Sequence, residues 1–168
     1  MFPSMRRFAQ QTAPAEAERM LAACDYGVLS LMGENGYPYG VPVNYVYANG
    51  RIYFHCAVEG HKLRALSKES RVCFTVVEKS GTVPAMLSTA YASVCVFGHA
   101  AVVRDEEERM DVLAAICARL APGYPEEGRS SIANDGPRTV IVRVTPEHIT
   151  GKTARQAVME RGQATPEK

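Results

Sequence analysis

Most apolar residues of this chain fall in short runs that alternate with polar residues or end at glycine-containing turns, as in β-strands. These runs predict six strands, at residues 26–32, 37–47, 51–57, 71–79, 91–104 and 138–144. Glu34-Asn35-Gly36 marks a turn after the first strand, and Asn49-Gly50, a strong hairpin signal, leads into the third. Connections of this kind predict antiparallel pairing.

Helical periodicity is confined to three segments. We expect one helix from Pro14 to about Cys24, a short one over residues 61–68, and a third over 106–120 that Asp105 caps. The stretches at 80–90 and 121–137 contain proline and glycine and are predicted to be loops, the second of them flexible. Many short strands with few crossovers predict a mainly β fold, an antiparallel barrel with flanking helices, because closure removes exposed strand edges.

Composition and charge limit the class of protein. The chain has 168 residues, 46% of them hydrophobic, and 19 basic against 18 acidic residues. This balance gives no reason to expect nucleic acid or a membrane surface as partner, and no apolar run approaches the roughly 20 residues that span a bilayer. Five scattered cysteines without a C-x-x-C motif are typical of a reduced, cytoplasmic protein. We expect a flexible N-terminal arm at 1–11, one domain at 12–155 and a polar tail at 156–168.

The segment from Ile52 to Lys62 carries the most informative candidate chemistry. It has the pattern of a strand that turns through Gly60 and opens a helix with His61 and Lys62. Free N–H groups at a helix start, beside a lysine and a histidine, suit a phosphate. The chain contains neither G-x-G-x-x-G nor G-x-x-x-x-G-K-[ST], so a phosphate-bearing cofactor in another β-rich fold is predicted. The alternative interpretation of Lys62 is a solvated surface lysine.

Five motifs in order resemble the pyridoxamine 5′-phosphate oxidase-like FMN-binding split barrels, most closely their nitroimidazole-resistance (nitroreductase-like) branch. The motifs are Tyr26-Gly-Val-Leu-Ser, Gly36-Tyr-Pro-Tyr-Gly-Val-Pro-Val-Asn-Tyr45, Ile52-Tyr-Phe-His-Cys-Ala-Val-Glu-Gly-His-Lys62, Ser93-Val-Cys-Val-Phe-Gly98 and His148-Ile-Thr-Gly-Lys152. The resemblance covers roughly residues 5–155. The resemblance implies a six-stranded antiparallel split barrel, and a homodimer with FMN in a cleft between the subunits.

The resemblance also implies which residues contact the FMN. They are Pro42, Val43, Asn44, Tyr45, His55, Cys56, Ala57, Gly60, His61, Lys62, Ser93 and Lys152. Lys62 would pair with the phosphate and Ser93 would donate to it. Lys152, of the same or of the partner subunit, would be a second contact. Asn44 would offer a donor and an acceptor to the flavin ring. Tyr45 can stack on the ring or pack in the core, and Cys56 is interpreted as a small filler near the cofactor, with a nucleophile as the alternative.

His55 is the candidate catalytic residue. It ends a strand just before the phosphate turn, and imidazole transfers protons near neutral pH. It also matches a histidine regarded as functionally important in the nitroimidazole-resistance relatives, whereas a structural histidine is the alternative. No metal is expected, because His55 and His61 are six residues apart with no carboxylate or cysteine pattern of a zinc site.

We therefore expect an FMN-dependent oxidoreductase that reduces small flat acceptors such as nitroimidazoles or other nitro-aromatics. The cofactor would carry the chemistry, and the protein would bind and orient it. The alternative is a split-barrel protein that binds flavin or haem without turnover. The chain has no tryptophan and lacks the arginine-rich C-terminal motif of true pyridoxamine phosphate oxidases, which argues against vitamin B6 oxidation.

Overall fold

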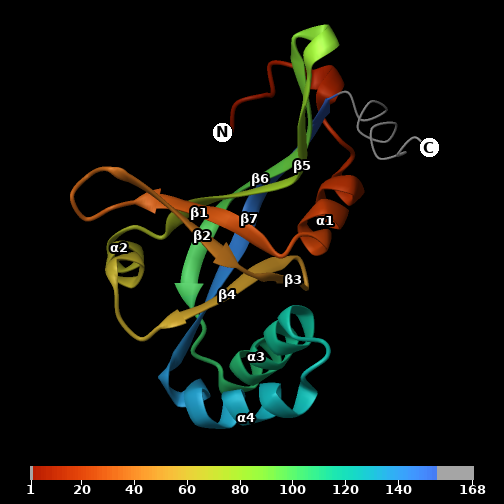
Figure 1. Cartoon of the computed structure of the whole chain (residues 1–168). Coiled ribbons are helices and arrows are strands. Elements are labelled where there is room, and N and C mark those ends of the chain that lie inside the picture. The colour runs from red at the N-terminus through yellow and green to blue at the C-terminus, as the bar shows by residue number, and fades with distance from the viewer. Residues whose placement is uncertain (1, 155–168) are drawn as a thin grey trace.

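A computed structural model describes residues 2–154 (Figure 1). It contains one antiparallel sheet with the strand order β2-β1-β5-β6-β7-β4-β3. The strands are β1 Tyr26–Met32, β2 Pro38–Asn44, β3 Val46–Ala48, β4 Arg51–Ala57, β5 Arg71–Val83, β6 Ser88–Val102 and β7 Thr139–Ala154. The helices are α1 Pro14–Ala23, α2 His61–Lys68, α3 Glu106–Leu120 and α4 Pro125–Asp135, with short 3-10 turns at Phe8–Gln10, Pro84–Met86 and Gly136–Arg138. The mainly β class with flanking helices is confirmed.

The described chain has seven strands where the sequence predicted six. The predicted strand at residues 37–47 divides at Tyr45, so that β2 pairs with β1 while β3 pairs with β4. These two pieces are adjacent in sequence but lie at opposite edges of the sheet. The extra strand therefore arises because one continuous segment joins the two edges as the sheet curls into a barrel.

The barrel interior follows the two-residue alternation of the strands. In β5, Val72, Phe74 and Val76 are buried while the residues between them face outward. Helix α1 contributes Met20 and Leu21, both fully buried, to the same core. Burial of side chains of this size stabilises the fold by about 1.5–3 kcal/mol each. A second, smaller core lies between the barrel and α3.

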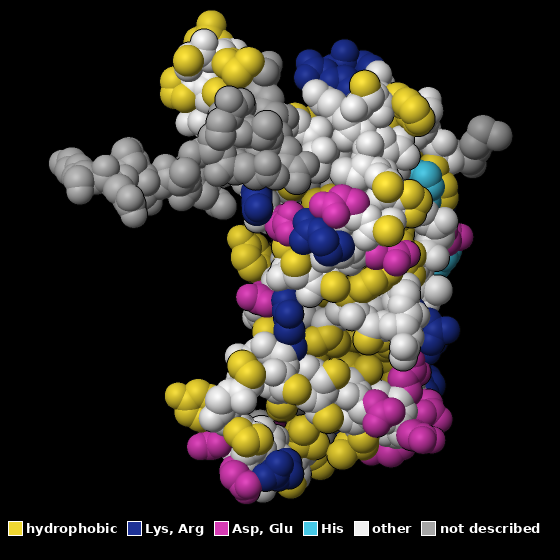
Figure 2. Space-filling view, turned by 90° about the vertical axis from the view of Figure 1, so that its right-hand side faces the viewer, with side chains coloured by type: hydrophobic (Ala, Val, Ile, Leu, Met, Phe, Trp, Pro, Cys, Tyr) yellow, Lys and Arg dark blue, Asp and Glu magenta, His cyan; other side chains and the backbone are white. Residues whose placement is uncertain are grey.

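Strands β5 and β6 form a long hairpin, which corrects the loop predicted at residues 80–90. The two strands stay paired as far as Val83 and Ser88, and the turn Pro84–Met86 forms the tip. The hairpin projects beyond the barrel (Figure 1), and Figure 2 shows apolar side chains gathered on this tip at the top of the molecule. Cross-strand pairing thus overrides the low strand propensity of Gly81.

The glycine in the middle of β6 marks an irregularity, as its position in the sequence predicted. The register between β6 and β7 shifts at Phe97/Gly98. A Cβ at Gly98 would lie 2.2 Å from the Thr145 carbonyl oxygen. Only glycine lets the two backbones approach this closely.

Residues 121–137 are largely helical, so the predicted flexible loop is wrong there. Helix α4 begins at Pro125, with Glu126 and Glu127 in its first turn, both favourable at a helix start. None of its residues is buried, and it packs on α3. The Asp105 cap predicted for α3 is confirmed, because its carboxylate accepts from the Glu108 N–H at 2.8 Å.

The N-terminal segment lies against β7. Gln11 forms a bridge with Lys152, and the Phe2 ring stacks on His148 at 4.7 Å between centroids.

The tail predicted at 156–168 lies outside the described residues. Among residues 2–154, no helix is long and apolar enough to cross a membrane.

Candidate cofactor site

The turn between β4 and α2 has the form that the sequence predicts for a phosphate site. Gly60 precedes the first helical residue with φ 143°, a backbone conformation that favours glycine. No heavy atom lies within 4 Å of the position that a Cβ on Gly60 would occupy, leaving out its chain neighbours. No side chain caps the helix, so its first N–H groups have no side-chain acceptor there. The approach to the start of α2 is therefore open and offers donors.

Three of the four basic side chains of α2 turn toward one carboxylate. Arg64 Nε donates to Glu34 at 2.8 Å, Lys68 Nζ lies 3.2 Å from it, and His61 Nδ1 lies 3.9 Å from it. The hydrogen bonds from Arg64 and Lys68 lower the pKa of Glu34. Glu34 thus anchors the β1–β2 turn to α2 and offsets much of the charge of the helix.

Lys62 points away from this cluster. Its Nζ lies 5.1 Å from the centroid of the Phe54 ring, and the side chain is half-buried. In the described part of the chain it pairs with no carboxylate. Lys62 is therefore the basic side chain of α2 that no carboxylate of the described residues neutralises, and its charge can pair with an anionic ligand.

His61 is held by its neighbours. Its ring meets the edge of Tyr39 at 4.7 Å between centroids, with the planes at 81°. A Cβ on Gly33 would lie 3.3 Å from His61 Nε2, so the β1–β2 turn passes close to the ring. These contacts fix the first turn of α2 against the barrel.

His55 and Cys56 face opposite sides of β4. Cys56 faces the core, where burial raises the pKa of its thiol and the charge of Lys62 opposes that rise. His55 is exposed on the outer side and lines a cavity of about 330 Å³ with Leu113 and Ile132 of the α3–α4 pair. Within one subunit the structure brings Lys62 to the side of Cys56, and His55 lies on the other side. Ala57 follows at the exposed end of the strand.

The predicted flavin-lining strand has two faces. Pro42 and Asn44 face outward, and the Asn44 amide donates to the Asp25 carbonyl at 3.0 Å. Val43 packs against the core. Tyr45 is 1% exposed, its hydroxyl donates to the Leu21 carbonyl at 2.6 Å, and burial raises its pKa. The packing interpretation of Tyr45 therefore describes its position in this structure.

Ser93 and Lys152 lie directly opposite each other on β6 and β7, both half-buried. Lys152 Nζ lies 5.3 Å from the centroid of the Tyr91 ring. Phe54, which contacts Lys62, pairs with Val142, ten residues from Lys152 along β7. At ~3.3 Å per residue this separates the two lysines by roughly 30 Å along the strand. The two predicted phosphate contacts therefore lie at separate positions along β7 within one subunit.

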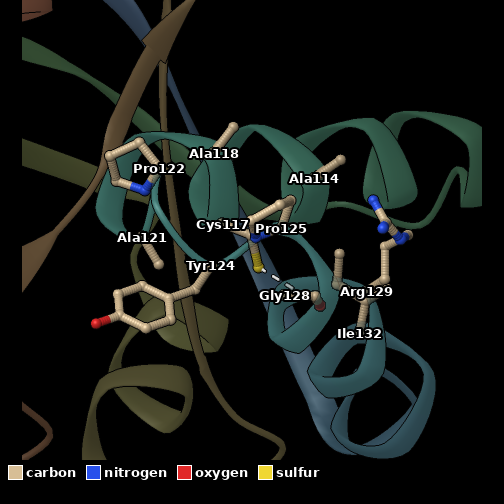
Figure 3. Close-up of a pocket in the computed structure, with 10 residues that line it drawn as sticks. All are labelled: Ala114, Cys117, Ala118, Ala121, Pro122, Tyr124, Pro125, Gly128, Arg129 and Ile132. Atoms are coloured by element: carbon tan, nitrogen blue, oxygen red, sulfur yellow. Dashed lines mark hydrogen bonds between the residues drawn. The ribbon is translucent and has the colours of Figure 1, made fainter.

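The sequence did not reveal the cavities of the α3–α4 pair. One of about 300 Å³ lies between the two helices, and Cys117 is central to it, its thiol 3.9 Å from the Gly128 carbonyl (Figure 3). Alanine, proline and isoleucine side chains line most of it, with Tyr124 and Arg129 around it. The sequence signal for α4, which forms one wall of these cavities, was Pro125 followed by two glutamates, a pattern typical of a helix start. Figure 2 shows acidic side chains clustered beside apolar surface in this lower part of the molecule.

Comparison with known proteins identifies the family. Residues 13–153 match the family model described as pyridoxamine 5′-phosphate oxidase. No curated protein matches the chain.

Solved structures share the fold at low sequence identity. A conserved hypothetical protein from Mycobacterium tuberculosis superposes with a TM-score of 0.79 at 18% identity, covering 98% of this chain and 96% of that one. The FAD and heme binding protein from Mycobacterium smegmatis gives 0.74 at 19%, covering 93% and 80%. A protein assigned provisionally to 5-nitroimidazole antibiotic resistance, from Bacteroides thetaiotaomicron, gives 0.67 at 23%, covering 83% of each chain. The resemblance inferred from the motifs is confirmed, and this chain belongs to the pyridoxamine 5′-phosphate oxidase family.

Proposed function

We propose that this protein binds FMN, with the phosphate at the start of α2, and acts as a flavin-dependent oxidoreductase. The observation that carries the proposal is the uncompensated charge of Lys62 beside the open turn at Gly60. A lysine and free helix-start N–H groups are the donors that a phosphate requires. When bound, FMN would supply reversible electron transfer, and the chain would bind and orient it.

We further propose a homodimer with the flavin at the subunit interface. Lys62 and the Ser93–Lys152 pair lie roughly 30 Å apart along β7, from ten residues at ~3.3 Å each, so one subunit does not bring them to a single phosphate. A second copy can present its own Ser93 and Lys152 to a cofactor held by Lys62. The five free thiols fit the reducing cytoplasm, where we place the protein.

The proposed substrates are small, flat acceptors such as nitro-aromatic rings, with His55 as proton donor. Because His55 and Lys62 lie on opposite sides of β4, this role requires His55 to act beside a flavin held by the partner subunit. The cavity at His55 measures about 330 Å³, the lower end of the range for small-ligand sites. Leu113, Ile116 and Ile132 give it apolar walls, and Asp135 adds a polar group. A ring can pack on such walls beside the His55 imidazole, a side chain of the kind that serves as a general acid.

His55→Gln tests the proton-donor role in the flavin-loaded protein. We expect the turnover of a nitroimidazole to fall by about 10²-fold, the lower end of general acid catalysis, with flavin content unchanged. Unchanged turnover would show that His55 is not the proton donor.

A second candidate function is the binding of flavin or haem without turnover. The observation that favours it is the shared fold of the Mycobacterium smegmatis protein described as binding FAD and heme. Mixing the loaded protein with NADH or NADPH separates the two functions. Rapid bleaching of the flavin absorbance supports the oxidoreductase, and an unchanged spectrum supports the binding protein.

The absorbance spectrum of the purified protein tests the premise of both candidate functions, which is that the protein binds a cofactor. We expect bands near ~375 and ~450 nm and release of FMN on denaturation, as a bound flavin requires. A colourless protein that also fails to take up added FMN would contradict the proposal.

A further inference from the structure

The two cavities of the α3–α4 pair adjoin each other. Cys117, Ala121 and Ile132 line both the cavity of about 330 Å³ at His55 and the cavity of about 300 Å³ around Cys117 (Figure 3). These shared residues form the wall between the cavities, so a ligand that passes along them reaches from one cavity into the other. Each cavity alone is at the lower end of the ~300–1,000 Å³ range of small-ligand sites, whereas the two together lie well inside it.

The two cavities differ in polarity. Polar side chains that line the cavity at His55 are His55 itself, Ser131, Asp135 and Thr139. The cavity around Cys117 is lined mainly by alanine, proline and isoleucine, and Arg129 at its edge pairs with Glu126. A ring with polar substituents therefore suits the first cavity, whereas a hydrocarbon chain gains most from the second, because it leaves water for apolar walls.

Small residues keep the cavity around Cys117 open. Ala114, Ala118 and Ala121 follow one another at a spacing of four and three residues, which places them on one face of α3 and its end. Opposite them on α4, Gly128 has no side chain, and a Cβ there would lie 3.2 Å from the Cys117 Cβ. A larger side chain at these positions would occupy the space that a ligand chain needs.

We propose that the acceptor of this protein is a flat ring that bears an apolar chain, with the ring in the cavity at His55 and the chain in the cavity around Cys117. This inference rests on the proposed oxidoreductase function and names the substrate class of its site. The chain is remote from the reacting ring and binds equally in the ground and transition states, so it lowers KM and leaves kcat unchanged. Each methylene that leaves water raises the affinity by about two- to fourfold.

The test compares two 5-nitroimidazoles, one with a methyl and one with a hexyl group on the ring nitrogen, as acceptors for the flavin-loaded protein. For the wild type we expect kcat/KM to be at least about tenfold higher for the hexyl compound, with the difference in KM, because the additional methylenes are buried. We call this ratio of kcat/KM values the hexyl preference.

Two matched variants locate the chain. Ala118 lines the cavity around Cys117 and is exposed on α3, so Ala118→Leu fills the cavity with a good helix former and retains the fold. We expect it to lower the hexyl preference by about tenfold. Ala133→Leu makes the same change at an exposed position of α4 that belongs to neither lining, and it should leave the hexyl preference unchanged.

Protection of Cys117 from iodoacetamide measures binding without turnover. We expect the hexyl compound to slow the alkylation of Cys117 at concentrations about tenfold lower than the methyl compound requires, by the same burial of methylenes. Cys24, which belongs to neither lining, is the internal reference and should react at an unchanged rate. In Ala118→Leu the difference between the two compounds should disappear.

The outcomes separate this inference from the proposed function. Turnover of both compounds with the same KM, or an unchanged hexyl preference in Ala118→Leu, would overturn the inference and leave the oxidoreductase function standing. Protection of Cys117 by the hexyl compound without turnover of either compound would support the chain site and contradict the oxidoreductase function.

Discussion

The barrel and the α3–α4 pair differ in how tightly they are packed. Phe54 and Phe74 are completely buried in the barrel, whereas α4 has no buried residue and cavities of about 300 and 330 Å³ adjoin Cys117. A close-packed interior holds its backbone in place, while a loosely packed helix opens at low cost. The barrel therefore provides stability, and the helix pair beside His55 provides room for a ligand.

Replacing Phe74 with alanine should have the largest effect on stability. Its ring lies 5.0 Å from the Tyr45 ring between centroids, and a Cβ on Gly27 would lie only 2.4 Å from it. The cavity left behind should lower the free energy of unfolding by about 3–5 kcal/mol. Urea denaturation measures this loss, and a loss below about 1 kcal/mol would contradict a tightly packed barrel.

Ile132→Ala and Ile141→Ala compare the same substitution in the two regions. Ile132 is half-buried between the two cavities, whereas Ile141 is completely buried where β7 meets α3. We expect the free energy of unfolding to fall by about 1 kcal/mol for Ile132→Ala and by about 2–5 kcal/mol for Ile141→Ala, because a more deeply buried side chain leaves a larger cavity when it is removed. Hydrogen exchange of the Ile132 variant should speed up in α4 and not in the barrel. Equal losses of unfolding free energy at the two sites would contradict the difference in packing between the barrel and the α3–α4 pair.

Glu108 connects the two regions, and replacing it should have the smallest effect on the free energy of unfolding. From α3 it accepts hydrogen bonds from Arg143 Nη1 of β7, at 2.9 and 2.8 Å, and from the Tyr53 hydroxyl of β4 at 2.8 Å. These bonds lower its pKa below the usual 4.5. The stability they contribute is therefore complete above about pH 4.5 and is lost as the pH falls through the lowered pKa.

Glu108→Gln should cost about 0.5–1 kcal/mol at pH 7, since the site is partly exposed. The variant should lose less stability than the wild type between pH 7 and pH 3, because it has no carboxylate to protonate. Urea denaturation at the two pH values measures both quantities. Identical pH dependence in variant and wild type would show that Glu108 does not connect the regions energetically.

Local sequence signals predicted most of the barrel. The strands at 26–32 and 51–57 and the helices at 61–68 and 106–120 have the bounds that alternation, turns and caps indicated. The failures arose where pairing over longer distances decides the structure. Gly81 is in a strand because it pairs with Ala90. Helix α4 lacks an apolar stripe, so its sequence has the composition of a loop.

The candidate site was predictable only where its residues are consecutive. The turn at Gly60 and the helix that starts at His61 could be recognised because local geometry determines them. That Glu34 would offset the charge of Arg64 and Lys68 depends on the position of the β1–β2 turn, which no local pattern shows. Strand alternation does separate His55 from Cys56, and this signal was present in the sequence.

We propose that Lys62 at the start of α2 holds the phosphate of FMN, and titration calorimetry with FMN and with riboflavin tests this role directly. The two ligands differ only in the phosphate. For the wild type and for Lys68→Gln, a control on the same helix whose lysine pairs with Glu34, we expect tighter binding of FMN than of riboflavin.

Lys62→Gln should weaken FMN binding by about 10- to 100-fold, as the loss of a charge-assisted hydrogen bond implies, and leave riboflavin binding unchanged. FMN binding by Lys62→Gln as tight as that of the wild type would contradict the account.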